Sequence, residues 1–342
     1  MIDNEPKKAI IKQKKILEMF KLKIGFYSAS TPITALSPKR FRRAIDFLQQ
    51  QGVRLTAGSL TRKQDNYRSG SIDERAREIN ELIHNDQVEI IMATIGGTNT
   101  NSVLPDIDFA YLRCHPKTFV GYSDATALLL AVKTQAPQCR VLYGPALVAS
   151  FGEWQPFVGM TWHYFNQVIT TGSHQIVQLQ GPKFWSDERL NWENFEQPKE
   201  QRVNAWHYTK QPVLEGRLIG GNLNTMYGII GSKYFPQLSS EDLLLIEDAE
   251  KDAATVEKNF AMLKNAGVFN QIKGIILGKH ALFDDQGSHK TPIEILLEVV
   301  NNPQLPIIYD YDCCHTVPMM TTPLGAHTII NAQTMTAEFS DF

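Results

Sequence analysis

Ser123 lies in a segment typical of a nucleophile elbow. An apolar strand-like run ending at Val120 is followed by GYSDA and then by an apolar stretch with helical periodicity. The small residues Gly121 and Ala125 leave space for a sharp turn that exposes the serine oxygen between strand and helix. An oxyanion formed there would face free N–H groups and the positive end of the helix. Serine also caps helices frequently, so the segment alone leaves a structural role open.

Two further strand ends carry the partners that a reactive serine needs. An activated serine requires a base within hydrogen-bond reach and usually an acid that orients this base. Glu247 follows the apolar run LLLI, and His315 follows the run IIYDYDCC. Either residue alone is more often a capping carboxylate or a core histidine. Three such groups at three strand ends can converge on one cleft, which favours Ser123, His315 and Glu247 as nucleophile, base and orienting acid.

A metal or nucleotide cofactor is not expected. Cys313 and Cys314 would point to opposite faces of a strand, so they are poorly placed to share an ion. His280, His289 and His327 show no tight ligand spacing. The first strand is not followed by G-x-G-x-x-G, which weakens a dinucleotide-binding interpretation.

Alternating strand and helix patterns place these groups. In the first half, strands are expected over residues 23–30, 53–59, 88–97 and 117–123, with helices over 37–51, 71–83 and from 127. In the second half, strands are expected over 212–224, 242–249, 273–280, 306–315 and within 326–339, with helices over 225–231, 254–266 and 291–301. Such alternation predicts parallel sheets with ligands at the carboxyl ends of the strands.

The fold class expected is therefore α/β in two domains. An N-terminal parallel-sheet domain of flavodoxin- or amidotransferase-like type covers residues 22–165 and carries the nucleophile. An aromatic-rich interdomain or substrate segment covers 166–211, and a smaller, β-rich α/β domain over 212–342 carries Glu247 and His315. All five tryptophans lie between residues 151 and 210. Substrate contact and packing between domains are equally compatible with this cluster.

Residues 1–21 form a predicted helical extension. Five lysines are interleaved with large apolar residues there, and the favoured interpretation is a helix packed on its own domain; contact with a membrane or partner is the alternative. The continuous apolar block of a secretory signal is missing.

The composition excludes several classes of protein. Against 34 Lys and Arg stand 36 Asp and Glu, a net charge of -2 over 342 residues, which argues against a nucleic-acid-binding protein. Apolar runs such as 127–132 have the length of core segments, so no membrane association is expected. Four cysteines without zinc or disulfide spacing fit a reducing cytoplasm.

Five motifs in order resemble the LD-carboxypeptidase family of serine peptidases. They are IGGTNTNSVLPDID, GYSDATAL, GGNLNT, LLLIEDAE and CCHTVPMMTTPLG, and the resemblance runs from about residue 22 to the carboxyl terminus. It implies that Ser123 is the nucleophile, Glu247 the orienting acid and His315 the base, in agreement with the choice made from strand ends.

Within that family the chain resembles the microcin C self-immunity branch more than the murein tetrapeptide branch. IGGTNTN and the loop FWSDE carry this similarity, which implies that Trp185 stacks on the base of a peptidyl or aminoacyl nucleotide. Three departures bear on substrate details: Thr100 stands for the usual serine, Asp106 for an aromatic residue, and Cys314 for a glycine.

The sequence thus predicts a serine carboxypeptidase-type hydrolase that cleaves an amide or phosphoramidate bond in peptidyl- or aminoacyl-nucleotides. The N–H groups of Gly97 and Asp124 are expected to form the oxyanion hole, and Trp185, Asn99 and Asn222 to contact a small peptidyl or nucleotide-linked substrate. Release of terminal D-alanine from murein tetrapeptide is the alternative reaction, and a catalytically silent ligand-binding protein the alternative class. A homodimer is one option for its assembly.

Overall fold

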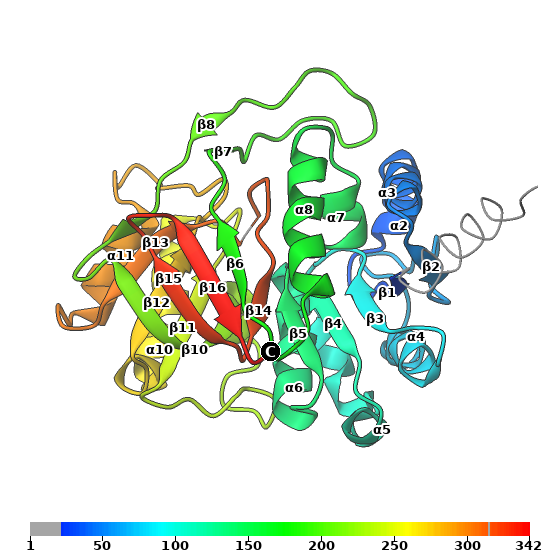
Figure 1. The fold of residues 1–342 in the computed structure, drawn as a ribbon, viewed down its shortest axis with the longest axis horizontal. Coiled ribbons are helices and arrows are strands. Elements are labelled where there is room, and N and C mark those ends of the chain that lie inside the picture. The colour runs from blue at the N-terminus through cyan, green and yellow to red at the C-terminus, as the bar shows by residue number, and fades with distance from the viewer. Residues whose placement is uncertain (1–21, 314) are drawn as a thin grey trace, which may run out of the picture.

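The computed structural model describes residues 22–313 and 315–342, and over these ranges it confirms the predicted α/β class (Figure 1). One sheet belongs mainly to the first half of the chain and a second, larger sheet to the second half. The predicted helical extension over residues 1–21 and Cys314 lie outside the described residues. No helix in the described ranges has both the length and the apolar character needed to cross a membrane.

The N-terminal sheet is parallel except at one edge, in the order β14-β5-β4-β3-β1-β2. Its strands are β1 (Lys23–Tyr27), β2 (Arg54–Ala57), β3 (Ile90–Ala93), β4 (Thr118–Gly121), β5 (Arg140–Tyr143) and β14 (Thr322–Leu324). Every residue of β3 is buried, as expected for a central strand covered by helices on both faces. The strands β5 and β14 were not predicted.

Helices cover this sheet in two groups (Figure 1). They are α2 (Ile33–Leu36), α3 (Pro38–Gln50), α4 (Ile72–His84), α5 (Phe109–Cys114), α6 (Thr126–Gln135), α7 (Leu147–Phe151) and α8 (Phe157–Thr170), with 3-10 segments η1 (Thr100–Asp106) and η2 (Ser123–Ala125). One group joins α3 to α7 and α7 to α8, and in the other α4 and α6 both pack against η1. A capping box begins α4: Ser71 Oγ accepts the Glu74 N–H, and the Glu74 carboxylate accepts the Ser71 N–H.

The C-terminal sheet has the order β6-β16-β15-β10-β11-β12-β13-β9, with β10 to β13 parallel. Its strands are β6 (Val177–Gln180), β9 (His207–Tyr208), β10 (Val213–Asn222), β11 (Asp242–Glu247), β12 (Gly274–Gly278), β13 (Ile307–Tyr311), β15 (His327–Asn331) and β16 (Thr336–Ser340). Its helices are α9 (Leu223–Tyr227), α10 (Ala253–Asn265) and α11 (Pro292–Val300), with the 3-10 turn η3 (Val268–Asn270).

Several predicted boundaries in this half differ from the structure by a few residues, and two of these differences lie near the site. Helix α9 begins at Leu223 and not at residue 225, because the side chain of Asn222 caps it by accepting the Thr225 N–H at 3.0 Å. Strand β13 ends at Tyr311 and does not run on to His315. The next side chain, Asp312, turns into a buried polar cluster, which removes it from the strand ladder.

The two sheets share parts of the chain. β14, from the second half, pairs antiparallel with β5 and completes the N-terminal sheet. β6 lies in the segment predicted to join the domains and pairs with β16 at the edge of the other sheet. A short hairpin, β7 (Phe184–Trp185) with β8 (Arg202–Val203), leads into a long loop at the top of the molecule in Figure 1.

Trp206 is a packing residue of this shared region. It is buried, and its Nε1–H donates to Asp312 Oδ2 at 2.7 Å. The same oxygen accepts Asn204 Nδ2, and Lys279 Nζ donates to the other oxygen at 2.5 Å. Asp312 thereby fastens the segment before β9 to the strand region that precedes His315.

Asp312→Ala should lower the free energy of unfolding by about 3–5 kcal/mol, because the buried Lys279 ammonium would lose its counter-ion. Urea unfolding of the parent and variant measures the change. Asp46→Ala is the matched control: its ion pair with Arg42 is half exposed, so the loss should stay below about 1 kcal/mol. Equal, small losses in both variants would contradict the role of the Asp312 cluster.

Candidate active site

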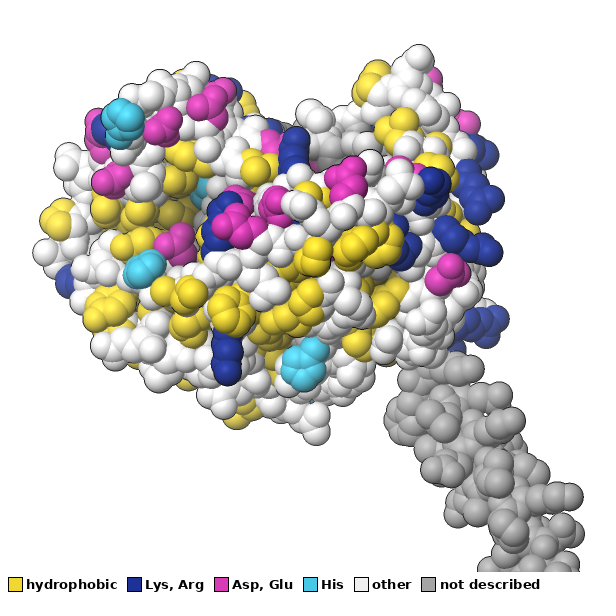
Figure 2. Space-filling model, turned by 90° about the horizontal axis from the view of Figure 1, so that it is seen from above, with side chains coloured by type: hydrophobic (Ala, Val, Ile, Leu, Met, Phe, Trp, Pro, Cys, Tyr) yellow, Lys and Arg dark blue, Asp and Glu magenta, His cyan; other side chains and the backbone are white. Residues whose placement is uncertain are grey.

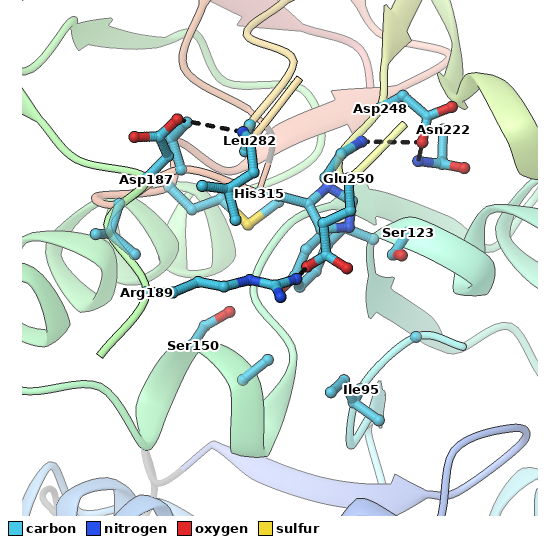
Figure 3. A pocket seen from close by; sticks show the side chains of 18 of the residues that line it. Ile95, Ser123, Ser150, Asp187, Arg189, Asn222, Asp248, Glu250, Leu282 and His315 are labelled. Atoms are coloured by element: carbon cyan, nitrogen blue, oxygen red, sulfur yellow. Dashed lines mark hydrogen bonds and ion pairs between the residues drawn. The ribbon is translucent and has the colours of Figure 1, made fainter. Parts of the chain in front are cut away.

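A cavity of about 310 Å³ opens where strand ends of both sheets meet. From the first half of the chain, Gly97 and Ser123 line it; from the second half, Asn222, Asp248 and His315 do so. Figure 2 shows the molecule from above, with acidic and basic side chains close together between two lobes. Figure 3 shows Ser123 and His315 on neighbouring parts of the cavity wall. Ser123 and His315, from strand ends in different halves of the chain, therefore line the same cavity.

Ser123 has the strained geometry of an elbow. It lies two residues beyond the end of β4, starts η2, and has a φ of 60°, in the left-handed region. That conformation costs an ordinary residue about 1–2 kcal/mol and persists only where surrounding contacts impose it. A Cβ at Gly96 would lie 2.6 Å from Ser123 Oγ, and one at Gly121 would lie 2.8 Å from the Ala125 Cβ. Both glycines therefore make room for the turn.

His315 is held by a fully buried carboxylate. Its Nδ1 lies 2.7 Å from Glu247 Oε2, and no part of Glu247 is exposed to solvent. The other carboxylate oxygen, Oε1, accepts Tyr143 Oη–H at 2.5 Å and Asn222 Nδ2–H at 3.0 Å. The carboxylate orients Nδ1 as the protonated nitrogen, which leaves Nε2 of the imidazole as the acceptor. The Tyr122 ring packs edge-on against the imidazole at 4.8 Å between centroids.

The pair shifts the pKa of each member. Burial alone would lower the pKa of His315, but the Glu247 carboxylate outweighs it and raises that pKa above the ordinary 6.5. Burial would likewise raise the pKa of Glu247, and the imidazolium with the Tyr143 and Asn222 hydrogen bonds lowers it overall. Burial, followed by the charge of Glu247, raises the pKa of the neighbouring Asp248.

The predicted oxyanion-hole residues flank Ser123. Gly97 lines the cavity with a φ of 148°, and a Cβ there would lie 2.2 Å from Ser30 Oγ, so only glycine fits. Asp124 follows the serine and is buried. Its carboxylate accepts the N–H and Oγ1–H of Thr100 at 2.9 and 2.7 Å, which ties the elbow to the turn that follows β3.

Of the residues predicted to contact substrate, one lines the cavity and the others lie outside its lining. Asn222 lines the cavity, yet its amide nitrogen donates to Glu247 and Asp248 and its oxygen accepts from Thr225. Asn99 is not part of the lining, and its side-chain oxygen accepts from Ser30 and Arg75.

Trp185 is half-buried beside the cavity lining and not within it. Its ring lies 5.2 Å from the Arg202 guanidinium and 5.3 Å from Lys279 Nζ. The next residue, Ser186, exchanges two backbone hydrogen bonds with Val317, two positions beyond His315. Trp192, later in the same loop, does line the cavity and packs under the Arg40 guanidinium at 4.0 Å.

Charged residues at the cavity were missed by the sequence analysis. Arg189 extends across the opening and forms an ion pair with Glu250 (Figure 3). Deeper in the lining, Glu153 pairs with Arg40 at 3.1 Å and with Lys199 at 3.0 Å. No periodic pattern marks these residues, since the pairs join segments far apart in the chain. Within the described residues, no group of three or more His, Cys, Asp or Glu is arranged to hold a metal ion.

An α/β fold with a serine at a sharp strand-to-helix turn is typical of serine hydrolases. The model of the LD-carboxypeptidase N-terminal domain matches residues 24–144, and that of the C-terminal domain matches residues 215–330. The chain belongs to the LD-carboxypeptidase family and is a serine peptidase, which confirms the resemblance seen in the sequence.

Similar proteins lie within this family. A putative carboxypeptidase of Vibrio cholerae is 48% identical, covering 93% of this chain and 95% of its own. The microcin C7 self-immunity protein MccF of Escherichia coli is 45% identical over 90% of both chains. A solved structure of MccF in complex with aspartyl sulfamoyl adenosine matches with a TM-score of 0.90 and 43% identity, over 94% of this chain and 96% of that one. MccF has also been solved with glutamyl sulfamoyl guanosine.

His315 should titrate with a pKa above 6.5, and Glu247→Gln should lower that pKa by about one or more, because the opposing charge is lost. Histidine ring signals followed by NMR across pH measure both values. Glu153→Gln, at another part of the cavity, should leave the titration of His315 unchanged. A His315 pKa that is the same with and without the Glu247 charge would contradict the assigned pair.

Proposed function

We propose that this protein is a serine carboxypeptidase-type hydrolase of aminoacyl- or peptidyl-nucleotides that uses Ser123, His315 and Glu247 as a catalytic triad. The main support is the hydrogen bond between His315 and the buried Glu247. His315 and Ser123 line the same cavity. A buried acid that orients a histidine beside an elbow serine is the arrangement that acyl transfer requires.

In the proposed reaction, Ser123 Oγ attacks the substrate carbonyl carbon while His315 Nε2 accepts the hydroxyl proton. The C–N bond then breaks, and His315 returns the proton to the leaving nitrogen. Water, deprotonated by His315, attacks the resulting ester and releases a carboxylate together with the free serine. Glu247 keeps the imidazole in one tautomer and stabilises its protonated form.

Charge on the carbonyl oxygen is proposed to be balanced by the N–H groups of Gly97 and Asp124. Gly97 lies between β3 and η1, and Asp124 follows the proposed nucleophile, so one donor comes from each of two adjacent strand-end turns. Both turns are fixed before substrate arrives, by the Asp124 bonds to Thr100 and by the acceptance of the Thr98 N–H by Ser30. Fixed donors of this kind stabilise the transition state without reorganising.

The substrate class rests on the relatives and on the charges of the cavity. MccF was solved with nucleosides that carry an acidic aminoacyl-sulfamoyl group. The cavity in this chain has cations in Arg40 and Lys199 and carboxylates in Glu153 and Asp248. Groups of both signs suit a ligand that carries an ammonium and an anionic linkage. The role proposed is detoxification of microcin C-type compounds.

The remaining sequence predictions are part of this proposal. The segment over 166–211 connects the nucleophile domain to the domain that carries Glu247 and His315, and contributes to substrate binding. A cytoplasmic location is proposed from cysteine usage, since Cys114 and Cys139 are free thiols. A homodimer stays a prediction.

Ser123→Ala and His315→Ala should each lower kcat by about 10⁴- to 10⁶-fold, because the members of a triad act as one unit. Glu247→Gln should cost about 10⁴-fold. Hydrolysis of an aminoacyl-nucleotide, followed by chromatography, gives the rates, and labelling by a fluorophosphonate tests Ser123 directly. Near-parent turnover in all three variants would contradict the proposed triad. If the parent protein neither hydrolyses the substrate nor is labelled at Ser123, it is a ligand-binding protein without catalytic activity.

Trp185→Ala should weaken an aminoacyl sulfamoyl adenosine by about one to two factors of ten, the usual value of stacking on a base. Fluorophosphonate labelling of Ser123 should stay unchanged, since the ring does not line the cavity. Calorimetry measures the affinity.

Trp192→Ala is the matched comparison, because this ring lies in the cavity under Arg40. If only Trp192→Ala weakens the affinity, the base stacks on Trp192 and not on Trp185. Unchanged affinity in both variants would favour the murein tetrapeptide, whose cleavage the same assay tests by release of D-alanine.

A further inference from the structure

The hydroxyl of Tyr143 contacts both the serine turn and the triad carboxylate. Its oxygen accepts the Ser123 N–H at 3.1 Å, and its proton is donated to Glu247 Oε1 at 2.5 Å. Tyr143 is fully buried at the end of β5, where it lies opposite Gly121, two residues before the serine. One side chain thereby joins the backbone of the nucleophile to the acid that orients the base.

Only one assignment of donors and acceptors fits the hydrogen bonds around the Tyr143 hydroxyl. A backbone N–H can only donate, so Tyr143 Oη is its acceptor and the phenolic proton is free for Glu247. Oε1 then has two donors, Tyr143 and Asn222, and Oε2 is left to His315. The resulting chain runs from Ser123 N–H through Tyr143 and Glu247 to His315 and connects strands of both sheets.

The ring of Tyr143 is packed for this position. A Cβ at Gly221 of β10 would lie 2.9 Å from Tyr143 Cε2, so the glycine lets the two sheets approach at the phenol. Burial, followed by the charge of Glu247, raises the pKa of Tyr143 well above 10, which keeps the hydroxyl protonated as a donor. The packing depends on the ring alone and the chain of bonds on the hydroxyl, so the two contributions can be separated.

We propose that Tyr143 is a positioning residue that couples the geometry of the Ser123 elbow to the charge of the Glu247–His315 pair. The inference rests on the proposed function, because it assigns catalysis to that pair. Loss of the hydroxyl removes one donor from Glu247, and the carboxylate, less compensated, attracts a proton on His315 more strongly. The Ser123 N–H also loses the acceptor that supports its left-handed conformation.

Other ionisable groups face this pair. Asp248 and Lys251 follow Glu247 along the chain, His280 comes after β12, and Cys313 lies before His315. Tyr143→Phe alters none of them. A change in the pH profile of this variant therefore reports on the hydroxyl.

Tyr143→Phe should lower kcat by about 10- to 100-fold, the loss expected for a hydrogen bond to a charged group. KM should change less than about threefold, because the hydroxyl is not in the cavity lining. The acidic limb of kcat/KM, and of the fluorophosphonate labelling rate, should move to higher pH by about half to one pH unit. The labelling rate needs no natural substrate.

Tyr164→Phe is the matched control. Tyr164 is also buried, and its hydroxyl donates to Gln180 O at 2.8 Å, but it lies outside the cavity lining and contacts neither Ser123 nor Glu247. This variant should keep the parent kcat and pH profile. A Tyr143→Phe variant that also keeps both would overturn the proposal.

A fluorinated tyrosine at position 143 covers the case in which Tyr143→Phe does not fold. 3,5-Difluorotyrosine keeps the ring and hydroxyl but is a stronger donor, so the acidic limb should move to lower pH. An unmoved limb, or one that moves to higher pH, would overturn the coupling. Ser123→Ala in the same assays separates the two levels: if it keeps parent turnover, the proposed function fails, whereas a dead Ser123→Ala with an unaffected Tyr143→Phe sinks only the role of Tyr143.

Discussion

A carboxylate with no contact to water is the constraint on which this site depends. Glu247 sits at the end of a fully buried strand, and an ionised group there is stable only when donors surround it. Those donors come from three places in the chain: Tyr143 on β5, Asn222 on β10 and His315 beyond β13. Satisfying one buried charge therefore fixes where the two sheets meet, and His315 is held as part of the same arrangement.

Close backbone approach is the second condition that the site imposes. The left-handed serine needs Gly96 and Gly121 beside it, and the phenol between the sheets needs Gly221. At each of these positions the absence of a side chain lets neighbouring groups come close to the backbone, which only glycine allows. Strain at the elbow is thus held in place by contacts that also position the charges.

The triad candidates could be predicted because each lies just after a strand, and the ends of parallel strands meet at one edge of a sheet. An apolar run followed by a polar residue is visible in sequence, and parallel strands bring such ends to one edge. Tyr143 could not be found in this way, since a tyrosine at the end of a buried strand has the same pattern whether its hydroxyl is structural or functional. β14 is three residues long and contains a proline, so no periodicity marks it. The Arg189–Glu250 pair joins a loop to a strand end across the cleft, which local patterns do not encode.

The placement of β14 has a consequence for the order in which the protein is made. The N-terminal sheet keeps an open edge at β5 until residues 322–324 have been synthesised, and Tyr143 is the β5 residue that pairs with Thr322. An open edge of this kind is a site for non-native pairing, so the nascent chain is exposed to aggregation while the residues between β5 and β14 are being synthesised. The proposed nucleophile, Ser123, by contrast, lies in the first half of the chain. A nascent chain therefore contains Ser123 long before it contains His315, and the proposed triad cannot form until His315 has been synthesised.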